Sequence, residues 1–403
     1  MPTETLRIAF ATPEFVTEEH FDGGLANYVN RVSKKLAALG HDVHVVTLST
    51  KNEDEFDHDG VIVHRVMLKP GWSTINRITR YTLSTTLHWL NFSTQTYRKL
   101  KQLHSCKPFN LIQYPNYSSC GLFSIPLLRT SHVVRASSYE SDWNSASGMK
   151  RSVDSTLTEF LERLQYKLTP NVHVPSLRVQ RMLVTRSGVI NARLIRTPFY
   201  IETSDWDPTV YDQFFKDKKY VLYFGRFQLH KGFHTLAQAL PKFLNQCPDA
   251  HVALVGRDME TSLSSSMASF ARAQCNGENE RLLILENLPH SKLYPIIAGA
   301  HLIVLPSLID NLPNTCLEAM GFGKVVVGTH DTSFEELITD GVNGFLVPRD
   351  NPRALAEKII DAWNDDRLPT ISAAAKQQVL DFAPEKTITS LLEYYSELVS
   401  NHA

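Results

Sequence analysis

Apolar residues recur along the chain in short continuous runs, which polar or glycine-containing stretches separate. Runs such as Leu6–Ala11, Tyr220–Phe224 and Leu302–Leu305 are typical of strands that are buried on both faces of a parallel sheet. Other stretches have the apolar spacing of a helix, of which Leu25–Leu39, ending at Gly40, is the clearest. This alternation predicts an α/β fold.

The alternation of strands and helices occurs twice, which indicates two domains. Leu6–Ala11, Leu25–Leu39 and Val43–Leu48 form one βαβ unit, and a fresh series begins at Tyr220–Phe224. Between the halves, Ile195–Pro208 contains two prolines and no clear periodicity, as a linker does. At 403 residues the chain is also longer than one average core requires.

Composition indicates a globular protein rather than a membrane-spanning or nucleic-acid-binding one. Apolar residues make up 43% and charged residues 21% of the chain, and the net charge is −1. No apolar run is long enough to span a bilayer, and the N-terminus lacks the layout of a signal peptide. The five cysteines are scattered without ligand spacing, as expected of reduced thiols in the cytoplasm.

The stretch Leu302–Gly323 carries the most specific candidate chemistry. Its strand leads into a loop with Asp310, and Leu312–Met320 is predicted to be a helix with Pro313 in its first turn. Seven residues separate Asp310 from Glu318, so both carboxylates can face a ligand over the helix N-terminus. Unpaired N–H groups there favour a diphosphate, and a carboxylate can accept sugar hydroxyls. Alternatively, Glu318 is solvated and Asp310 forms an ordinary turn.

A candidate phosphate loop follows the strand Tyr220–Phe224. Gly225 and Arg226 come directly after the strand, and Lys231 stands before the next helix. Arginine can bind two phosphate oxygens at once, lysine acts as a point charge, and glycine allows close approach. Exposed Arg and Lys are usually solvated, so this pattern is weak evidence when taken alone.

Together, the two stretches resemble the donor site of the retaining family-4 glycosyltransferases (glycosyltransferase group 1), which have the GT-B fold. Glu318-Ala319-Met320 and the glycines after it match their acidic motif, and Gly225-Arg226 with Lys231-Gly232 matches their diphosphate loop. The first acid of the motif is Asp310, where the family has a glutamate with one more methylene. The resemblance implies two Rossmann-like, doubly wound domains that face each other across a cleft.

The resemblance also implies the domain boundaries. Residues 1–198 are expected to form an N-terminal, acceptor-side domain, and residues 199–385 a C-terminal domain that binds the nucleotide-sugar. Residues 386–403 are expected to form a helix that crosses back to the N-terminal domain.

The resemblance implies transfer of a sugar from a nucleoside-diphosphate sugar to an acceptor hydroxyl, with retention of the anomeric configuration. The expected catalytic residues are Arg226, Lys231, Asp310 and Glu318. The residues expected to bind the donor are Gly23, Gly24, Gly225, Arg226, Lys231, Gly256, Asn311, Leu312, Pro313, Asn314, Thr315 and Glu318. The nucleotide-sugar is a co-substrate, and no cofactor or metal is expected, because fixed cations neutralise the departing phosphate.

The acceptor side departs from the family pattern. The family often has a histidine at the end of the strand that corresponds to Val133–Ala136, but this chain has Ser137 and Ser138 there. A hydroxyl can donate a hydrogen bond to a sugar but cannot carry a charge. Tyr139 and Glu140, which follow, are candidate replacements.

Residues 61–139 contain ten Lys or Arg and no Asp or Glu, with an aromatic-rich helical region predicted over Trp72–Leu103. Such a region implies a local positive field, which could attract an anionic or lipid-linked acceptor or a membrane surface. Alternatively, acids from elsewhere in the fold neutralise it. The N-terminus and the scattered cysteines lead us to expect a cytoplasmic protein. Peripheral contact of the basic region with the inner face of the membrane stays open.

Two other functions also stay open. One is a GT-B-type sugar-nucleotide epimerase or a phosphorylase, against which the Asp310–Glu318 pattern argues. The other is a non-catalytic nucleotide-sugar-binding partner protein, which the missing histidine suggests. The donor sugar is not identified, although the resemblance favours a UDP-sugar over GDP-mannose.

Overall fold

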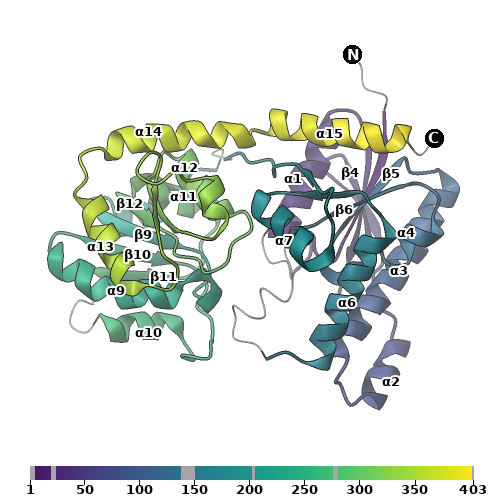
Figure 1. Cartoon of the computed structure of the whole chain (residues 1–403), viewed down its shortest axis with the longest axis horizontal. Helices are drawn as coiled ribbons and strands as arrows, with labels where there is room; N and C mark the ends of the chain where they lie inside the picture. The colour runs from purple at the N-terminus through teal and green to yellow at the C-terminus, as the bar shows by residue number, and fades with distance from the viewer. Residues whose placement is uncertain (1–4, 20–23, 138–149, 202–204, 276–279, 402–403) are drawn as a thin grey trace. The chain divides into compact units, whose positions relative to one another are not determined.

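The computed structural model describes residues 5–19, 24–137, 150–201, 205–275 and 280–401 (Figure 1). These residues form two compact units, and the chain passes between them after Pro198 and again after Ala383. Unit 1 holds the described residues up to Pro198 together with those from Pro384 onwards, and unit 2 holds those from Phe199 to Ala383. No helix among the described residues is long and apolar enough to cross a membrane.

Unit 1 is built on an eight-stranded sheet in the order β3-β4-β2-β1-β5-β6-β7-β8. Every neighbouring pair is parallel except β3 with β4. The strands are β1 Arg7–Thr12, β2 Asp42–Leu48, β3 Glu55–His58, β4 Val61–Val66, β5 Leu111–Pro115, β6 Ser131–Arg135, β7 Val172–Val174 and β8 Arg193–Leu194. The helices are α1 Gly24–Ala38, α2 Gly71–Ile78, α3 Ser84–Cys106, α4 Ser124–Leu127, α6 Val153–Leu168, α7 Leu177–Ser187 and α15 Pro384–Ser400.

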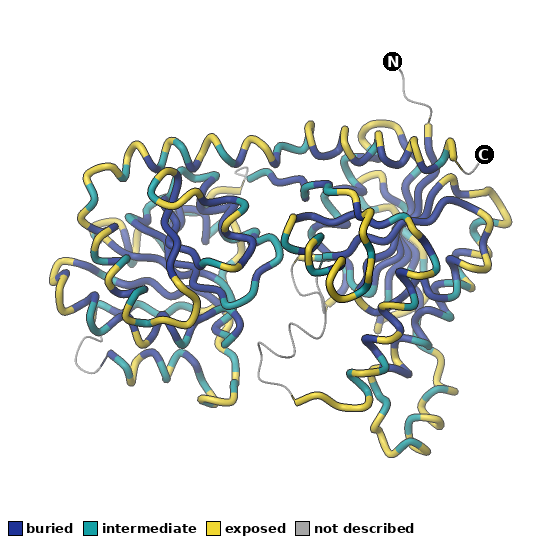
Figure 2. The backbone as a smooth tube through the Cα atoms, viewed as in Figure 1, coloured by how far each residue is buried: buried dark blue, intermediate teal, exposed yellow. Residues whose placement is uncertain are grey.

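The central strands of unit 1 are apolar because helices cover both faces of the sheet. Every residue of β1 is buried. Apolar residues of α1 and α15 form the core on one face, and those of α3, α4, α6 and α7 form the core on the other. Figure 2 shows these strands as continuously buried. This two-sided cover is why the strands appear in the sequence as unbroken apolar runs.

Unit 2 is built on a six-stranded parallel sheet in the order β11-β10-β9-β12-β13-β14. The strands are β9 Tyr220–Phe224, β10 His251–Val255, β11 Leu282–Leu285, β12 Leu302–Val304, β13 Val326–Thr329 and β14 Phe345–Val347. The helices are α8 Thr209–Phe214, α9 Phe233–Gln246, α10 Met267–Gln274, α11 His290–Gly299, α12 Asn314–Gly321, α13 Pro352–Trp363 and α14 Leu368–Val379. The strand order reverses between β9 and β12, which makes this pair the switch point of a Rossmann-like sheet.

The structure divides one predicted helical region into two helices and shortens one predicted helix. The region Trp72–Leu103 divides into α2 and α3, and between them Arg80 and Tyr81 take positive φ values of 51° and 61°. The helix expected over Leu312–Met320 begins at Asn314 instead, with Pro313 as its N-cap at φ −74° and ψ 103°. A residue before proline is biased away from helical geometry, which explains why Leu312 stays in the loop.

Candidate functional site

The candidate site lies at the carboxyl edge of the unit 2 sheet, at the switch point. β9 and β12 are paired neighbours, so the loops that follow them start side by side. A hydrogen bond of 2.9 Å from the N–H of Leu308 to the carbonyl of His230 joins these loops. In open α/β sheets, ligands bind in the crevice at this point.

Lys231 and Asp310 come from these two loops and form an ion pair. Lys231 Nζ lies 2.7 Å from Asp310 Oδ2, although 79 positions separate the residues. Asp310 is only 5% exposed, and its Oδ1 accepts a hydrogen bond of 3.1 Å from the N–H of Asn311. Two residues that were expected to contact different parts of a donor therefore also contact each other.

Two glycines allow the loops at this edge to approach closely. Gly232 has a φ of +66°, and a β-carbon there would overlap the carbonyl oxygen of Pro306, just after β12. A β-carbon on Gly256, just after β10, would overlap the carbonyl oxygen of Gly225. Gly232 thus sets the spacing between the β9 and β12 loops, and Gly256 that between the β9 and β10 loops.

The N-terminus of α12 contributes backbone N–H groups to the same edge. Its first two, on Asn314 and Thr315, have no acceptor among the described residues. Two of the residues before them cannot donate a backbone N–H to a bound donor. The N–H of Asn311 is already bound to the adjacent carboxylate, and Pro313 has no N–H. Leu312 packs against the core. The N–H groups of Asn314 and Thr315, in the first turn of α12, are therefore placed to donate to an anion.

Glu318 is the fifth residue of α12, so it lies just over one turn from the N-terminus. It is closer to that terminus than it would be in the predicted helix, which started at Leu312. It is 7% exposed, and its Oε1 lies 3.7 Å from Nε2 of His290. His290 is the first residue of α11, and its ring stacks on Tyr294 with the ring centroids 5.0 Å apart. His290 was not among the predicted site residues, and its only signal in the sequence is its position shortly after β11, at the same edge of the sheet.

Positive charge dominates the loop after β9. Burial, with the nearby charges of Lys231 and Arg226, lowers the pKa of His230 to about 3, so its imidazole is neutral at pH 7. The hydroxyl of Tyr223 donates a 2.7 Å hydrogen bond to the carbonyl of Arg226. Burial raises the pKa of Tyr223, which keeps this hydroxyl protonated. The loop thus carries two cations, Arg226 and Lys231, beside the neutral side chains of His230 and Tyr223. Two cations in one loop suit the binding of a phosphate.

Two family models match the chain, one in each unit. The model for Glycosyltransferase Family 4 matches residues 22–203, and the model for Glycosyl transferases group 1 matches residues 218–365. The chain belongs to the group 1, family 4 glycosyltransferases. Transfer of sugars is the activity that this family membership supports.

Similar proteins cover nearly the whole glycosyltransferase. It is 24% identical to the glycogen synthase of Mycobacterium tuberculosis over 93% of this chain and 91% of that protein. Sucrose-phosphate synthase from Thermosynechococcus elongatus superposes with a TM-score of 0.73 at 20% identity, over 98% of this chain and 100% of that one. Anabaena Alr3699/HepE, in complex with UDP and glucose, superposes with a TM-score of 0.72 at 18% identity, over 97% of this chain and 100% of that one. These structures share the GT-B fold.

Of the site residues expected in unit 1, the structure describes Ser137, expected on the acceptor side, and Gly24, expected to bind the donor. Both lie at the carboxyl edge of the unit 1 sheet: Ser137 follows β6, and its N–H donates a 3.0 Å hydrogen bond to Asn116 Oδ1. Gly24 begins α1, and a β-carbon there would meet nothing within 4 Å. Four other expected site residues lie outside the described residues, namely Gly23, Ser138, Tyr139 and Glu140.

The basic region of the glycosyltransferase, residues 61–139, is partly neutralised by acids from outside it. The ion pairs are Arg65–Glu18 at 2.7 Å, Arg65–Asp54 at 3.1 Å, Lys69–Glu53 at 2.6 Å and Lys107–Asp42 at 2.8 Å. Arg135 is buried and stacks on the ring of Tyr28, with 3.7 Å between its guanidinium carbon and the ring centroid. Of the two alternatives, neutralisation by acids from elsewhere in the fold therefore holds for Arg65, Lys69 and Lys107.

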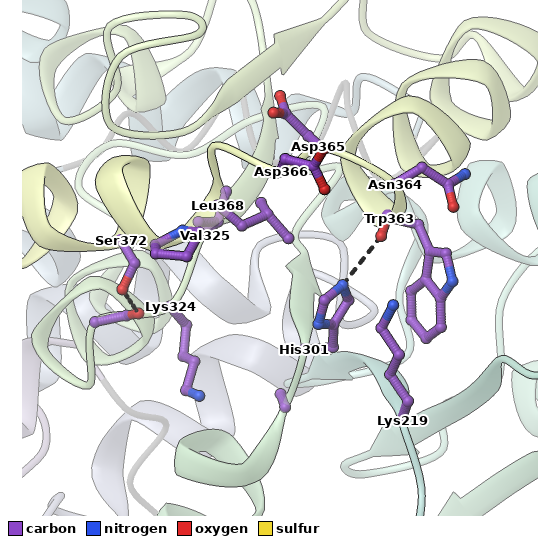
Figure 3. Close-up of a pocket in the computed structure, with 13 residues that line it drawn as sticks. Lys219, His301, Lys324, Val325, Trp363, Asn364, Asp365, Asp366, Leu368 and Ser372 are labelled. Atoms are coloured by element: carbon purple, nitrogen blue, oxygen red, sulfur yellow. Dashed lines mark hydrogen bonds between the residues drawn. The ribbon is translucent and has the colours of Figure 1, made fainter.

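A separate pocket of about 580 Å³ lies at the opposite edge of the unit 2 sheet (Figure 3). Its residues precede strands rather than follow them: Lys219 precedes β9, His301 precedes β12 and Lys324 precedes β13. His301 Nε2 donates a 3.1 Å hydrogen bond to the carbonyl of Trp363, and Lys219 Nζ lies 4.3 Å from the centroid of that indole. None of the expected donor residues lines this pocket, so we do not assign it to the donor.

Proposed function

We propose that this glycosyltransferase moves a hexose from a nucleoside-diphosphate sugar to an acceptor hydroxyl, with retention of the anomeric configuration and without a metal ion. The observation that carries the proposal is the arrangement at the switch point, where the Lys231–Asp310 pair, the N-terminus of α12 and buried Glu318 share one edge of the sheet. A UDP-sugar is the favoured donor, with GDP-mannose next. The UDP complex of HepE, which has the same fold, supports this preference.

In the proposed reaction, the donor diphosphate lies over the first turn of α12. The N–H groups of Asn314 and Thr315 and the cations of Arg226 and Lys231 stabilise the negative charge that develops on the departing β-phosphate. Electrostatic stabilisation of this kind is usually the largest single contribution to catalysis. Because these cations are fixed in place, the reaction needs no metal to neutralise the phosphate.

The two carboxylates have separate proposed roles. Glu318, one turn further along α12, accepts hydrogen bonds from the ribose hydroxyls, while Asp310 orients the donor sugar. The acceptor hydroxyl attacks the anomeric carbon from the face on which the phosphate departs. The bond between the anomeric carbon and the β-phosphate oxygen breaks as the new glycosidic bond forms. The leaving phosphate takes the proton of the acceptor hydroxyl. No separate general base is therefore required.

A second candidate is a nucleotide-sugar-binding protein without turnover. The observation that favours it is Ser137, which follows β6 where the family often has a histidine. A serine hydroxyl cannot carry the positive charge that a histidine can. Donor binding without nucleotide release in the presence of acceptors would support this second function.

The decisive experiment is a thermal-shift titration with UDP, GDP, ADP and their common sugar conjugates. A ligand at 100 times its dissociation constant stabilises the folded state by roughly 2.7 kcal/mol. We expect one nucleotide series to raise the melting temperature of the wild type, and Glu318→Ala to lose this shift. Glu318→Gln keeps the shape of the side chain, and it separates loss of the ribose contact from damage to the fold.

A matched control is Glu357→Ala, which removes an exposed glutamate from α13, away from the proposed site. This variant should keep the full nucleotide shift. If no nucleotide stabilises the wild type, the donor-site proposal is wrong. If a nucleotide does, release of free nucleotide on addition of candidate acceptors distinguishes a transferase from a binding protein.

A further inference from the structure

Unit 1 exposes several large apolar side chains at one end of its helical layer. α2 has no buried residue, and Ile75, Ile78 and the following Tyr81 are 44%, 75% and 64% exposed. Val153, the first residue of α6, is 68% exposed. Single exposed apolar residues are normal on a protein surface, but a group of them on neighbouring elements marks an interaction site.

These residues come together although α6 is far from α2 in the sequence. α2 packs against α3, and the carboxylate of Asp154 accepts hydrogen bonds of 2.9 Å from the N–H groups of both Thr85 and Thr86. The first turn of α6 is thereby fixed to the first turn of α3. We call the exposed residues at this end the helical tip: Ile75, Arg77, Ile78, Arg80, Tyr81 and Val153.

The helical tip projects beyond the sheet of unit 1. α3 has 23 residues and is about 35 Å long, whereas β5, which follows it, has 5 residues and spans about 17 Å. A helix that connects parallel strands runs opposite to them, so the first residues of α3 and α6 overshoot the carboxyl edge of the sheet. Figure 1 shows α2 beyond that edge, and Figure 2 shows it as largely exposed. Ser137 follows β6 at the same edge.

The charge of the helical tip is positive. Arg77 and Arg80 are exposed, and no Asp or Glu occurs between residues 61 and 139. Asp154, the acid nearest the tip in the sequence, already accepts hydrogen bonds from α3. Arg151 is also exposed, although it pairs with Glu159 at 3.1 Å. The helical tip therefore exposes aliphatic and aromatic side chains together with cations, on α2 and on the residues beside it.

We propose that the helical tip inserts into the headgroup region of an anionic lipid bilayer. Short amphipathic helices bind there by burying apolar side chains at the headgroup boundary, while Arg and Lys contact acidic headgroups. The complementary charge of an anionic lipid surface favours it over a protein partner, and α2 projects beyond the sheet, where it can reach such a surface (Figure 1). The contact is interfacial, because no described helix can span a membrane. This proposal does not depend on the identity of the donor.

The test is sedimentation of the full chain with vesicles of phosphatidylcholine, either alone or mixed with phosphatidylglycerol. We expect binding to the mixed vesicles that weakens with salt. Arg77→Gln with Arg80→Gln should lower the partition coefficient about 25-fold, or about five-fold for each charge. Ile75→Ser with Ile78→Ser should abolish most of the remaining, salt-resistant binding.

Matched controls lie elsewhere on unit 1. Ile190→Ser removes an aliphatic side chain that is 71% exposed, and Arg129→Gln removes an exposed cation of the same basic region. Both should bind vesicles as the wild type does, and all variants should keep its melting temperature. Absence of vesicle binding, equal binding to neutral and anionic vesicles, or unchanged binding by the tip variants would each overturn the proposal. So would concentration-dependent dimerisation that the tip substitutions abolish.

Discussion

Among single residues, Lys231 and Asp310 form the pair on which the proposed donor site depends most directly. Asp310 is almost fully buried, and Lys231 is the cation that compensates its charge. A buried charge that loses its partner destabilises the folded state, because it has given up hydration without compensation. The pair therefore stabilises the loops after β9 and β12 in addition to its proposed role in donor binding.

Replacing one partner of this pair should be more harmful than replacing both. We expect Lys231→Met to lower the free energy of unfolding by about 2 kcal/mol, because it leaves a buried carboxylate without its cation. Adding Asp310→Asn removes the stranded charge and should recover part of this loss. Urea-denaturation midpoints at pH 7 measure both effects. Equal losses in the single and the double variant would show that the two residues are not energetically coupled.

His230 should remain neutral throughout the physiological pH range. Its pKa is lowered to about 3 by burial and by the charges of Lys231 and Arg226, against an unperturbed value of about 6.5. The unfolded chain therefore takes up a proton below about pH 6.5 that folded His230 does not, so this residue makes acid conditions favour unfolding. NMR of histidine-labelled protein should show no titration of His230 between pH 5 and 8, and a midpoint near 6.5 would contradict the burial-based assignment.

Among secondary-structure elements, α12 depends on its surroundings for its position. It has 8 residues, fewer than an isolated helix needs to be stable in water. Buried Leu317 and Met320 hold it against the sheet, and the hydroxyl of Ser333 donates a 2.7 Å hydrogen bond to the carbonyl of Asn311 before it. These tertiary contacts fix where its N-terminus points.

Gly232 should be needed for the spacing between the β9 and β12 loops. In Gly232→Ala, the new methyl group would overlap the carbonyl of Pro306, in addition to the strain of a positive φ. Gly188→Ala is the matched control, because Gly188 has a similar φ of +68° but no atom within 4 Å of an added β-carbon. We expect Gly188→Ala to lose about 1–2 kcal/mol of stability and to keep nucleotide binding. Gly232→Ala should lose more stability and also weaken the nucleotide-dependent thermal shift.

In the whole molecule, the chain returns to unit 1 after completing unit 2. α15 contributes five buried residues to the core of unit 1, namely Ile388, Leu391, Tyr394, Tyr395 and Leu398. The hydroxyl of Tyr395 also donates a 2.5 Å hydrogen bond to Gln113 Oε1 in β5. Unit 1 is therefore assembled from both ends of the sequence, whereas the described part of unit 2 is continuous apart from short gaps.

Deletion of residues 384–403 should affect the two units differently. Each lost buried side chain removes about 1.5–3 kcal/mol, and five such losses approach the whole stability of a typical domain, about 5–15 kcal/mol. We expect unit 1 to lose its cooperative thermal transition. Unit 2 contains every described residue proposed for the donor nucleotide from Gly225 to Glu318, so its nucleotide-dependent shift should persist. Scanning calorimetry with and without UDP measures both, and loss of the UDP shift would contradict independence of the units.

Much of the fold could be predicted because its signals are local. The strand expected over Tyr220–Phe224 has the bounds that the structure shows, and the apolar run Leu282–Leu285 likewise coincides with β11. Unbroken apolar runs identify such strands because both faces of each sheet are covered. Ser176 is likewise of a residue type that favours the N-cap of a helix, and its hydroxyl accepts a 3.2 Å hydrogen bond from the N–H of Val179 in α7. An N-cap hydrogen bond joins residues only three positions apart, so it can be predicted from the local sequence.

What the sequence left open or missed depends mostly on distant residues. The sequence left open whether the basic region is neutralised, and the structure shows that acids outside it, Glu18, Asp42, Glu53 and Asp54, pair with three of its cations. His290 was missed because no local pattern connects it to Glu318. The shift of the α12 start from Leu312 to Asn314 depends on a proline and on the contacts of the loop before it. The ion pairs and the His290–Glu318 approach require knowledge of which strands and loops are neighbours, whereas the effect of Pro313 on Leu312 is local.

By itself, the sequence determined that this protein has two α/β halves, and that glycine-containing, cationic and acidic loops follow particular strands, because periodicity and turn chemistry act over a few residues. Only the tertiary structure decided that β9 lies beside β12, so that Lys231 contacts Asp310, and that α3 and α6 begin beside α2 at one exposed tip. Strand order and helix overshoot result from packing between distant segments. No local pattern in the chain encodes them.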